Sequence, residues 1–184
     1  MSQLAGAPPP PYPPPPRPKS SVPGWLIVVG IAVLAFIALF GVLVVLGIHG
    51  TRKYIANAKM AEARSVVGQI SRDAVAAFES RGALCPSASS PVPAAPPRAA
   101  KYQSSASDWD ADRASDAGFA CLKFSMATPQ YYQYDYRSTP AGFLVTARGD
   151  LDGDGVASRF EVEGRIQDGR LIVAPAIRET NPEE

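Results

Sequence analysis

The sequence predicts an α+β protein in which a long N-terminal helix, membrane-spanning in its first half, packs on a four-stranded antiparallel meander. Three observations support this prediction. Residues 25–48 are uncharged and apolar, residues 49–82 place apolar side chains at helical spacing, and the chain after residue 123 alternates with a period of two between turn signals. The expected segments are a proline-rich disordered tail (1–24), a transmembrane helix (25–48), an amphipathic helix (49–82), a connecting loop region (83–122) and an antiparallel β-sheet head (123–184).

The N-terminal tail is marked by proline. Ten of the 19 prolines lie before residue 24, without apolar periodicity. Such a composition favours a solvated polyproline II chain that cannot bury a core. Two interpretations stay open for it. The tail is either a docking segment for an aromatic groove on a cytosolic partner or a disordered spacer.

The apolar run 25–48 has the length of a membrane span. At ~1.5 Å per residue its helix is roughly 36 Å long, enough to cross a hydrocarbon core of about 30 Å. The run exceeds a signal-peptide core, and no A-x-A cleavage site follows it. We therefore expect a retained, single-pass membrane anchor.

Two criteria favour opposite orientations of this anchor. Two cations precede the span, whereas four follow it and favour a cytoplasmic C-terminal part by the positive-inside rule. A cysteine pair and an acidic loop, both described below, favour export of that part. We expect a cytoplasmic tail and a periplasmic or extracellular head. The cations are Arg17 and Lys19 before the span, and Arg52, Lys53, Lys59 and Arg64 after it.

The helix beyond the span is predicted to be amphipathic and to end at Arg81 and Gly82, a basic last turn and a C-cap glycine. Its apolar stripe consists of Ala63, Val67, Ile70, Ala74, Ala77 and Phe78. The polar residues expected to face elsewhere are Glu62, Arg64, Gln69, Arg72, Asp73 and Glu79.

Four strands are predicted, at residues 130–137, 143–147, 159–166 and 171–174. The first places Tyr132, Tyr134 and Tyr136 on one face, which is more typical of cross-strand packing than of a binding surface. The third strand places Phe160, Val162 and Ile166 on one face. Residues 167–170 (QDGR) indicate a tight hairpin turn before the last strand. The stripe of the helix is expected to cover one face of this sheet.

The two cysteines, Cys85 and Cys121, are far apart and form no C-x-x-C motif. With the single histidine, His49, they cannot assemble a zinc site. In an oxidising compartment they are expected to form one disulfide. The alternative is a pair of buried free thiols.

The stretch from Asp150 to Glu161 matches the calcium-loop pattern D-x-[DN]-x-[DN]-G-x5-E in full. Carboxylate, carbonyl and hydroxyl oxygens are the ligands that Ca2+ prefers. The flanking residues alternate as strands do, so the alternative is an acidic turn between two strands. A second acidic run, residues 108–112, lacks the required glycine and is interpreted as a solvated loop. The candidate ligands are Asp150, Asp152, Asp154, the Val156 carbonyl, Ser158 and Glu161.

Composition and motifs also exclude several functions. A net charge of +1 argues against nucleic acid as a partner. The only histidine lies at the membrane boundary, and an acidic glycine loop repels phosphate rather than cradling it. We therefore expect a non-enzymatic protein.

Residues 54–70 (YIANAKMAEARSVVGQI), which closely follow the apolar run, resemble the type IV pilin and pseudopilin family. Residues 121–138 (CLKFSMATPQYYQYDYRS) and 142–162 (GFLVTARGDLDGDGVASRFEV) are similar to pilin-like fimbrial proteins of Gram-negative bacteria. The resemblance implies a bacterial inner-membrane protein. It also implies a structural subunit or accessory component of a type IV pilus or type II secretion-like apparatus, which contacts other pilin-like subunits through its hydrophobic stem.

The chain departs from that family at the start of the stem. A pilin leader ends in glycine and is followed by a stem with a glutamate near its start, whereas here Gly24 precedes Trp25 and residues 25–48 contain no acid. An unprocessed, non-polymerising relative is consistent with this departure. The alternative function is that of a bitopic inner-membrane adaptor with a proline-rich docking tail and an exported ligand-binding head.

Overall fold

The computed structural model describes residues 23–182, and for residues 47–53 it describes the backbone alone. The predicted proline-rich tail lies almost wholly outside this range. The chain divides into two compact units, Met1–Gly47 and Ile48–Glu184. The second unit is called the head below.

The described part of the first unit is helical and belongs to α1 (Gly24–Arg81). Its segment Gly24–Leu46 has a mean hydropathy of 3.1, and none of it is buried against other parts of the chain. By length and composition the segment can cross a membrane, and a signal sequence near an N-terminus satisfies the same criteria. The predicted span is therefore present as an exposed apolar helix.

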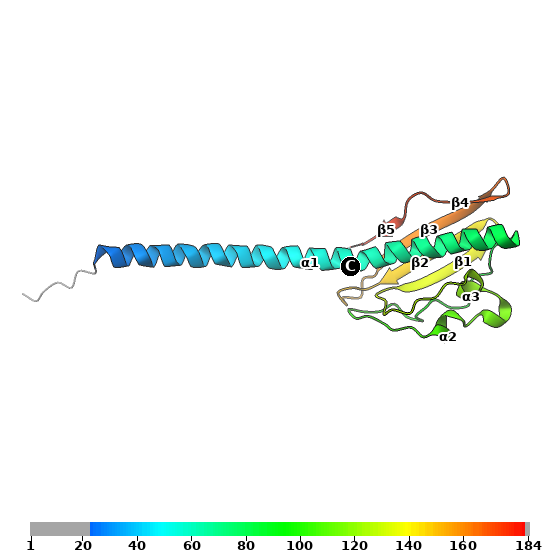
Figure 1. Ribbon diagram of the computed structural model, residues 1–184, viewed down its shortest axis with the longest axis horizontal. Helices are drawn as coiled ribbons and strands as arrows, with labels where there is room; N and C mark the ends of the chain where they lie inside the picture. Colours follow the sequence, from blue (N-terminus) through cyan, green and yellow to red (C-terminus); the bar gives the residue numbers. More distant parts are fainter. Residues whose placement is uncertain (1–22, 183–184) are drawn as a thin grey trace, which may run out of the picture. The chain divides into compact units, whose positions relative to one another are not determined.

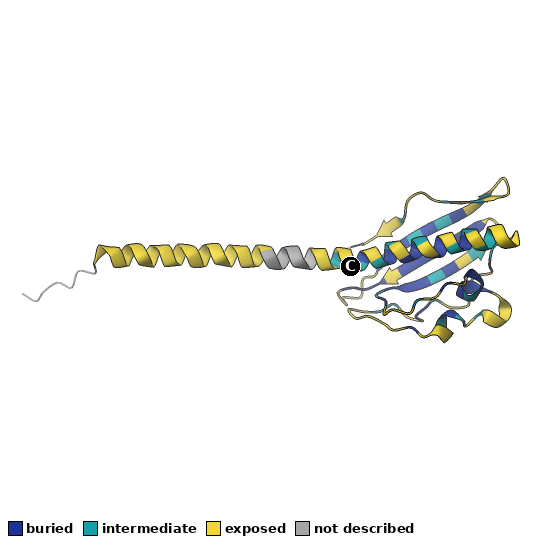
Figure 2. Cartoon of the chain, in the orientation of Figure 1, coloured by how far each residue is buried: buried dark blue, intermediate teal, exposed yellow. Residues whose placement is uncertain are grey.

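In the head, α1 buries the predicted stripe against a sheet (Figures 1 and 2). Ala63, Val67, Ile70 and Ala74 are almost fully buried, which confirms the helical spacing. Phe78, at the end of the stripe, is only half-buried. The helix ends as predicted, because Gly82 adopts a left-handed backbone with a φ of 71° and donates its N–H to the Phe78 carbonyl.

The sheet has the order β1-β2-β3-β4, and β5 pairs with β3 beside β4. Every pair is antiparallel, so the predicted meander is confirmed. The short β5 was not predicted, because three exposed residues carry no apolar alternation. The strands are β1 (Gln133–Thr139), β2 (Gly142–Gly149), β3 (Ser158–Gln167), β4 (Arg170–Val173) and β5 (Arg178–Thr180).

Tyrosine and phenylalanine fill the space between α1 and the sheet. Tyr132, Tyr134 and Tyr136 are fully buried, which supports the packing interpretation of their alternation. The ring of Tyr132 meets that of Phe160 edge to face, with 5.6 Å between centroids. Ile166, predicted on the same face as Phe160, is only partly buried near the end of β3.

The connection between α1 and β1 contains three short helical elements and contributes to the core. Trp109 is buried and meets Phe119 and Phe124 edge to face, at 5.0 and 5.2 Å between centroids. The run 108–112, interpreted as a solvated loop, thus carries a core tryptophan at the end of a helical turn. The elements are α2 (Ala106–Trp109), the 3-10 helix η1 (Arg113–Ser115) and α3 (Gly118–Leu122).

The predicted disulfide is confirmed. Cys85 and Cys121 are bonded, with 5.8 Å between their Cα atoms, and both are buried. The bond joins the residues just after α1 to α3, so it ties the long connection to the helix end. The same connection pairs with the outer edge of β1, where Val92 and Tyr134 exchange backbone hydrogen bonds.

The head has two ends that differ in chemistry. At the hairpin end, the turn at residues 139–142 and Ile166, which precedes the turn at 167–170, lie beside Phe78, near the end of α1. At the proximal end, the start of β1 and the β2–β3 loop lie near Glu62, close to the point where α1 first contacts the sheet. The chain leads from this proximal end to the apolar segment.

Candidate metal centre

The β2–β3 loop brings three carboxylates together at the proximal end. One oxygen from each of Asp150, Asp152 and Asp154 lies within 4.8 Å of the others. Asp150 is buried, whereas Asp152 and Asp154 are exposed. The three residues alternate along the chain, and the loop folds so that their carboxylates converge. This arrangement can hold a metal ion.

Asp150 organises the loop from inside. Its two carboxylate oxygens accept the backbone N–H groups of Gly153 at 2.7 Å and Gly155 at 3.1 Å. Both glycines have positive φ, 85° and 96°, a conformation that a side chain disfavours. Arg98 lies 3.8 Å from the same carboxylate, and the Ala99 N–H donates to the Asp150 carbonyl. The loop therefore has a defined shape.

The two exposed aspartates close smaller turns. Asp152 accepts the N–H of Asp154 at 3.1 Å, and Asp154 accepts the N–H of Val156 at 2.6 Å. These are the side-chain-to-backbone turns that Asp residues favour. Each of these contacts uses a single carboxylate oxygen.

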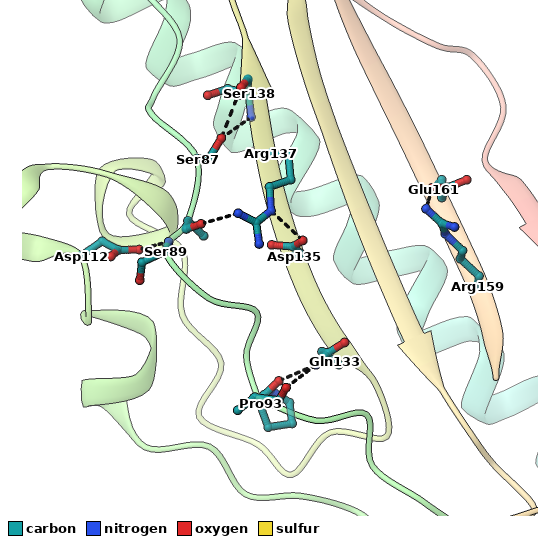
Figure 3. Close-up of polar contacts among 12 residues, drawn as sticks. Ser87, Ser89, Pro93, Asp112, Gln133, Asp135, Arg137, Ser138, Arg159 and Glu161 are labelled. Carbon is teal, nitrogen blue, oxygen red and sulfur yellow. Dashed lines mark hydrogen bonds and ion pairs between the residues drawn. The ribbon is translucent and has the colours of Figure 1, made fainter. Parts of the chain in front are cut away.

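The structure separates Glu161 from this group, contrary to the twelve-residue motif. Glu161 lies within β3 and forms an ion pair with Arg159 (Figure 3). In an EF-hand the last ligand lies on a helix, which rises ~1.5 Å per residue, whereas a strand rises about 3.3 Å. Glu161 is therefore carried roughly 10 Å beyond Ser158 and away from the loop. The prediction of Glu161 as a ligand is not supported by this geometry.

Ser158 and Val156, the other two candidate ligands, remain near the loop. The Ser158 hydroxyl donates to the Gly149 carbonyl at 2.9 Å across the last pair of β2 and β3, so its proton is committed to closing the loop. Val156 is exposed, with 44% of its surface accessible. Three of the six predicted ligand residues thus converge by their carboxylates.

These three carboxylates suit a hard cation, which takes oxygen ligands. Ca2+ binds six to eight oxygens, so backbone carbonyls and water would have to supply the remainder. Mg2+ also binds carboxylates and retains several waters. The ligand type therefore indicates a hard divalent cation of the Ca2+ or Mg2+ class.

A second polar site, at the same end, was missed in the sequence. The Glu62 carboxylate was expected to face away from the sheet, but it accepts the Tyr131 N–H at 2.7 Å and the Tyr134 hydroxyl at 3.2 Å. Burial raises the pKa of Glu62 above its ordinary value, and the two hydrogen bonds oppose that rise. Glu62 lies four residues before the apolar Val66, and this spacing on one helix face is the sequence signal that could have identified it.

Beside Glu62, two lysines converge on Tyr131. The Lys59 and Lys101 ammonium groups lie 4.8 and 4.9 Å from the centroid of its ring, within the range of a cation–π contact. Lys59 belongs to α1, and Lys101 belongs to the connection between α1 and β1. The proximal end thus carries a basic cluster as well as the acidic loop.

The outer face of the sheet is covered by ion pairs along the strands. Asp135 pairs with Arg137 at 2.9 Å (Figure 3). Arg137 also donates to the Ala88 carbonyl. Glu163 pairs with Arg165 at 2.8 Å. The charges within each pair neutralise one another, and the hydrogen bond from Arg137 also binds the connection to β1. The role of these contacts is structural.

Comparison with known protein families, curated proteins and solved structures finds no match to this chain.

Proposed function

We propose that this chain is a membrane-anchored, pilin-like structural subunit or accessory component of a type IV pilus or type II secretion-like apparatus, without enzymatic activity. The observation that carries this proposal is the composition of α1. Its first part, Gly24–Leu46, is exposed and apolar, and its later part buries an apolar stripe against a small antiparallel sheet. A membrane anchor followed by such a head is what the resemblance of residues 54–70 to pilins implies.

The disulfide supports placing the head outside the cytoplasm. Structural disulfides persist in oxidising compartments and are rare in the cytosol. Both cysteines are buried and bonded, and their bond spans 36 residues of sequence. A periplasmic or extracellular head, a bacterial inner-membrane anchor and a cytoplasmic tail form the corresponding topology.

Calcium is the ion proposed for the β2–β3 loop. Three converging aspartates and two glycines with positive φ match the first six positions of a calcium loop. For a dissociation constant near 0.1 mM, typical of extracellular modules, about 1 mM free calcium stabilises the head by roughly 1.4 kcal/mol. The ion would pin the loop and would not open a helix pair, because strands flank it.

The function is tested by the mature N-terminus. Mass spectrometry of the protein extracted from membranes distinguishes a chain that starts at Trp25 from one that starts at Met1 or Ser2. Cleavage before Trp25 supports a subunit that is processed like a pilin. An intact tail contradicts that processing.

The second candidate is a bitopic adaptor, in which the proline-rich tail binds a cytosolic partner and the head binds a ligand outside. It is favoured by one observation, the absence of any acidic residue from Gly24–Leu46, where pilins carry a glutamate. An intact N-terminus, together with capture of a cytosolic partner that is lost when residues 8–18 are deleted, supports this alternative.

A further inference from the structure

We propose that the proximal end of the head docks on an anionic lipid surface, namely the bilayer that Gly24–Leu46 enters. This inference rests on the proposed membrane anchoring. The docking surface is defined here as the side chains of Tyr54, Ile55, Lys59, Lys101, Tyr102 and Tyr131.

The basic part of this surface is held by the fold. Lys59 and Lys101 both lie within 5 Å of the Tyr131 ring centroid, although they come from separate segments. Tyr102 and Gln130 exchange two backbone hydrogen bonds of 2.8 Å. These bonds fix the part of the α1–β1 connection that carries Lys101. The Tyr131 backbone is in turn anchored on Glu62. Two cations are therefore presented together.

Exposed apolar side chains gather at the same end. Within the described residues of the head, five large apolar side chains are exposed, and four of them belong to the proximal end. They are Tyr54, Ile55, Tyr102 and Val156, whereas the fifth, Ile172, lies on β4. Tyrosine combined with lysine is typical of the bilayer interface, where aromatic rings sit at headgroup depth and lysine stems reach outward.

The distance along the chain identifies the lipid as the occupant. Residues 47–53 are the only residues between Leu46, where the apolar segment ends, and Tyr54. Seven residues span at most about 25 Å even when fully extended. The chain between Leu46 and Tyr54 is therefore too short to carry the head far from the bilayer that the apolar segment enters. Such tethering gives a high effective concentration, so that weak lipid contacts suffice.

The proximal end also carries negative charge that opposes docking. Asp152 and Asp154 are exposed, Asp150 lies beside Arg98, and Glu62 is half-buried. A cation bound by the loop would reduce this repulsion. Docking is therefore expected to be stronger with calcium than with a chelator, while the lysines confer the preference for anionic lipid.

The experiment uses the full chain in lipid nanodiscs with about 1 mM calcium, the concentration range of extracellular calcium modules. One set contains phosphatidylcholine alone, and the other contains one third phosphatidylglycerol. Hydrogen exchange is measured on peptides covering residues 98–104 and 127–133. We expect exchange there to be about threefold slower or more in the anionic discs, because each lysine near such a surface adds to binding.

The variant Lys59→Gln with Lys101→Gln removes the basic cluster and is expected to abolish the difference between the discs. The matched control, Lys123→Gln with Arg170→Gln, removes two exposed cations that lie away from the proximal end, at the end of α3 and at the β3–β4 turn. The control should keep the difference. Hydrogen exchange measured on peptides from β2 and β3 reports whether each variant is folded.

Two further results bear on the inference. In wild type, ~1 M salt shortens the Debye length to about 3 Å and should remove the difference between the discs. Equal hydrogen exchange in both kinds of disc overturns the proposal. A difference that survives in the Lys59 and Lys101 variant also overturns it, because that result would indicate bridging by calcium alone. Failure of membrane anchoring is recognised separately, because the chain then does not co-elute with the nanodiscs.

Discussion

Glu62 on α1 and Tyr131, two residues before β1, are joined by a 2.7 Å hydrogen bond across 69 positions of the sequence. The bond runs from a backbone N–H to a carboxylate that is partly removed from water. It links the part of the helix nearest the apolar segment to the sheet, beside the Tyr134 hydroxyl. The contact therefore contributes to holding the proximal end of the head together.

The variants Glu62→Gln and Glu62→Ala distinguish the effect of the Glu62 charge from the effect of its hydrogen bonds as an acceptor. Because burial raises its pKa above the usual 4.5, the folded protein binds more protons than the unfolded chain just above that pH. Stability should thus fall as pH rises through that interval. Glu62→Gln should reduce this fall and leave the contribution of Asp73, whose pKa is also raised by burial. Urea unfolding of the chain in detergent between pH 4 and pH 8 measures the fall.

Glu62→Ala is the matched comparison, because it removes the acceptor as well. It leaves the Tyr131 N–H and the Tyr134 hydroxyl without this partner, which costs about 1–3 kcal/mol. Glu62→Gln retains an acceptor and should cost less than about 1 kcal/mol at neutral pH. Equal losses in the two variants would contradict the role of the hydrogen bonds.

The Arg64–Glu179 pair is expected to hold β5 locally. Its two hydrogen bonds of 2.7 and 2.9 Å connect α1 to a strand of three exposed residues. Because the pair is partly exposed, Arg64→Met should cost no more than about 1 kcal/mol globally. Hydrogen exchange of residues 178–180 should nevertheless accelerate. Arg165→Gln, which breaks an ion pair within β3, is the control and should leave that exchange unchanged.

The same pair has a pH signature of opposite sign to that of Glu62. The hydrogen bond from Arg64 lowers the pKa of Glu179 below its usual 4.5. Its contribution is therefore present above that pH and is lost as pH falls through the lowered pKa. After correction for the intrinsic exchange rate, amides of β5 should lose protection in wild type as pH falls through the lowered pKa of Glu179, and this loss should be absent from the Arg64 variant.

Parts of this structure could be predicted because one periodicity determines them. The stripe from Ala63 to Ala74 and the buried tyrosines of β1 follow from helix and strand spacing alone. The strand β5 and the Trp109 turn could not be predicted, because they are stabilised by partners distant in sequence, such as Arg64 and Phe119.

The acidic loop shows the same limit at the candidate site. Its spacing predicts a ligand at Glu161, but spacing carries no information on whether the chain beyond the loop is a helix or a strand. Strand pairing of Glu161 with Thr146 and Arg178 decides this, and it directs the carboxylate towards Arg159. The three aspartates could be identified, because they lie within a single turn.

Removal of the disulfide should destabilise the head without changing its sheet. The bond closes a loop of 36 residues, and the loss of chain entropy in the unfolded state corresponds to about 4 kcal/mol at most. Thermal unfolding of Cys85→Ala with Cys121→Ala should show a lower Tm than wild type. A reductant should lower the wild-type Tm similarly and leave the double variant unchanged. A reductant effect on the double variant would show that the shift has another cause.

The calcium proposal makes different predictions for residues that the sequence motif treats alike. Asp152→Asn retains an acceptor for the Asp154 N–H but removes a charge from the cluster, so it should abolish stabilisation by calcium and leave unfolding in chelator unchanged. Glu161→Gln should retain stabilisation by calcium, because its carboxylate is paired with Arg159 on β3. Thermal unfolding with calcium and with chelator compares the two variants with wild type. Loss of the calcium effect in Glu161→Gln would show that the loop rearranges to recruit this residue, whereas identical wild-type curves in calcium and in chelator would refute calcium binding itself.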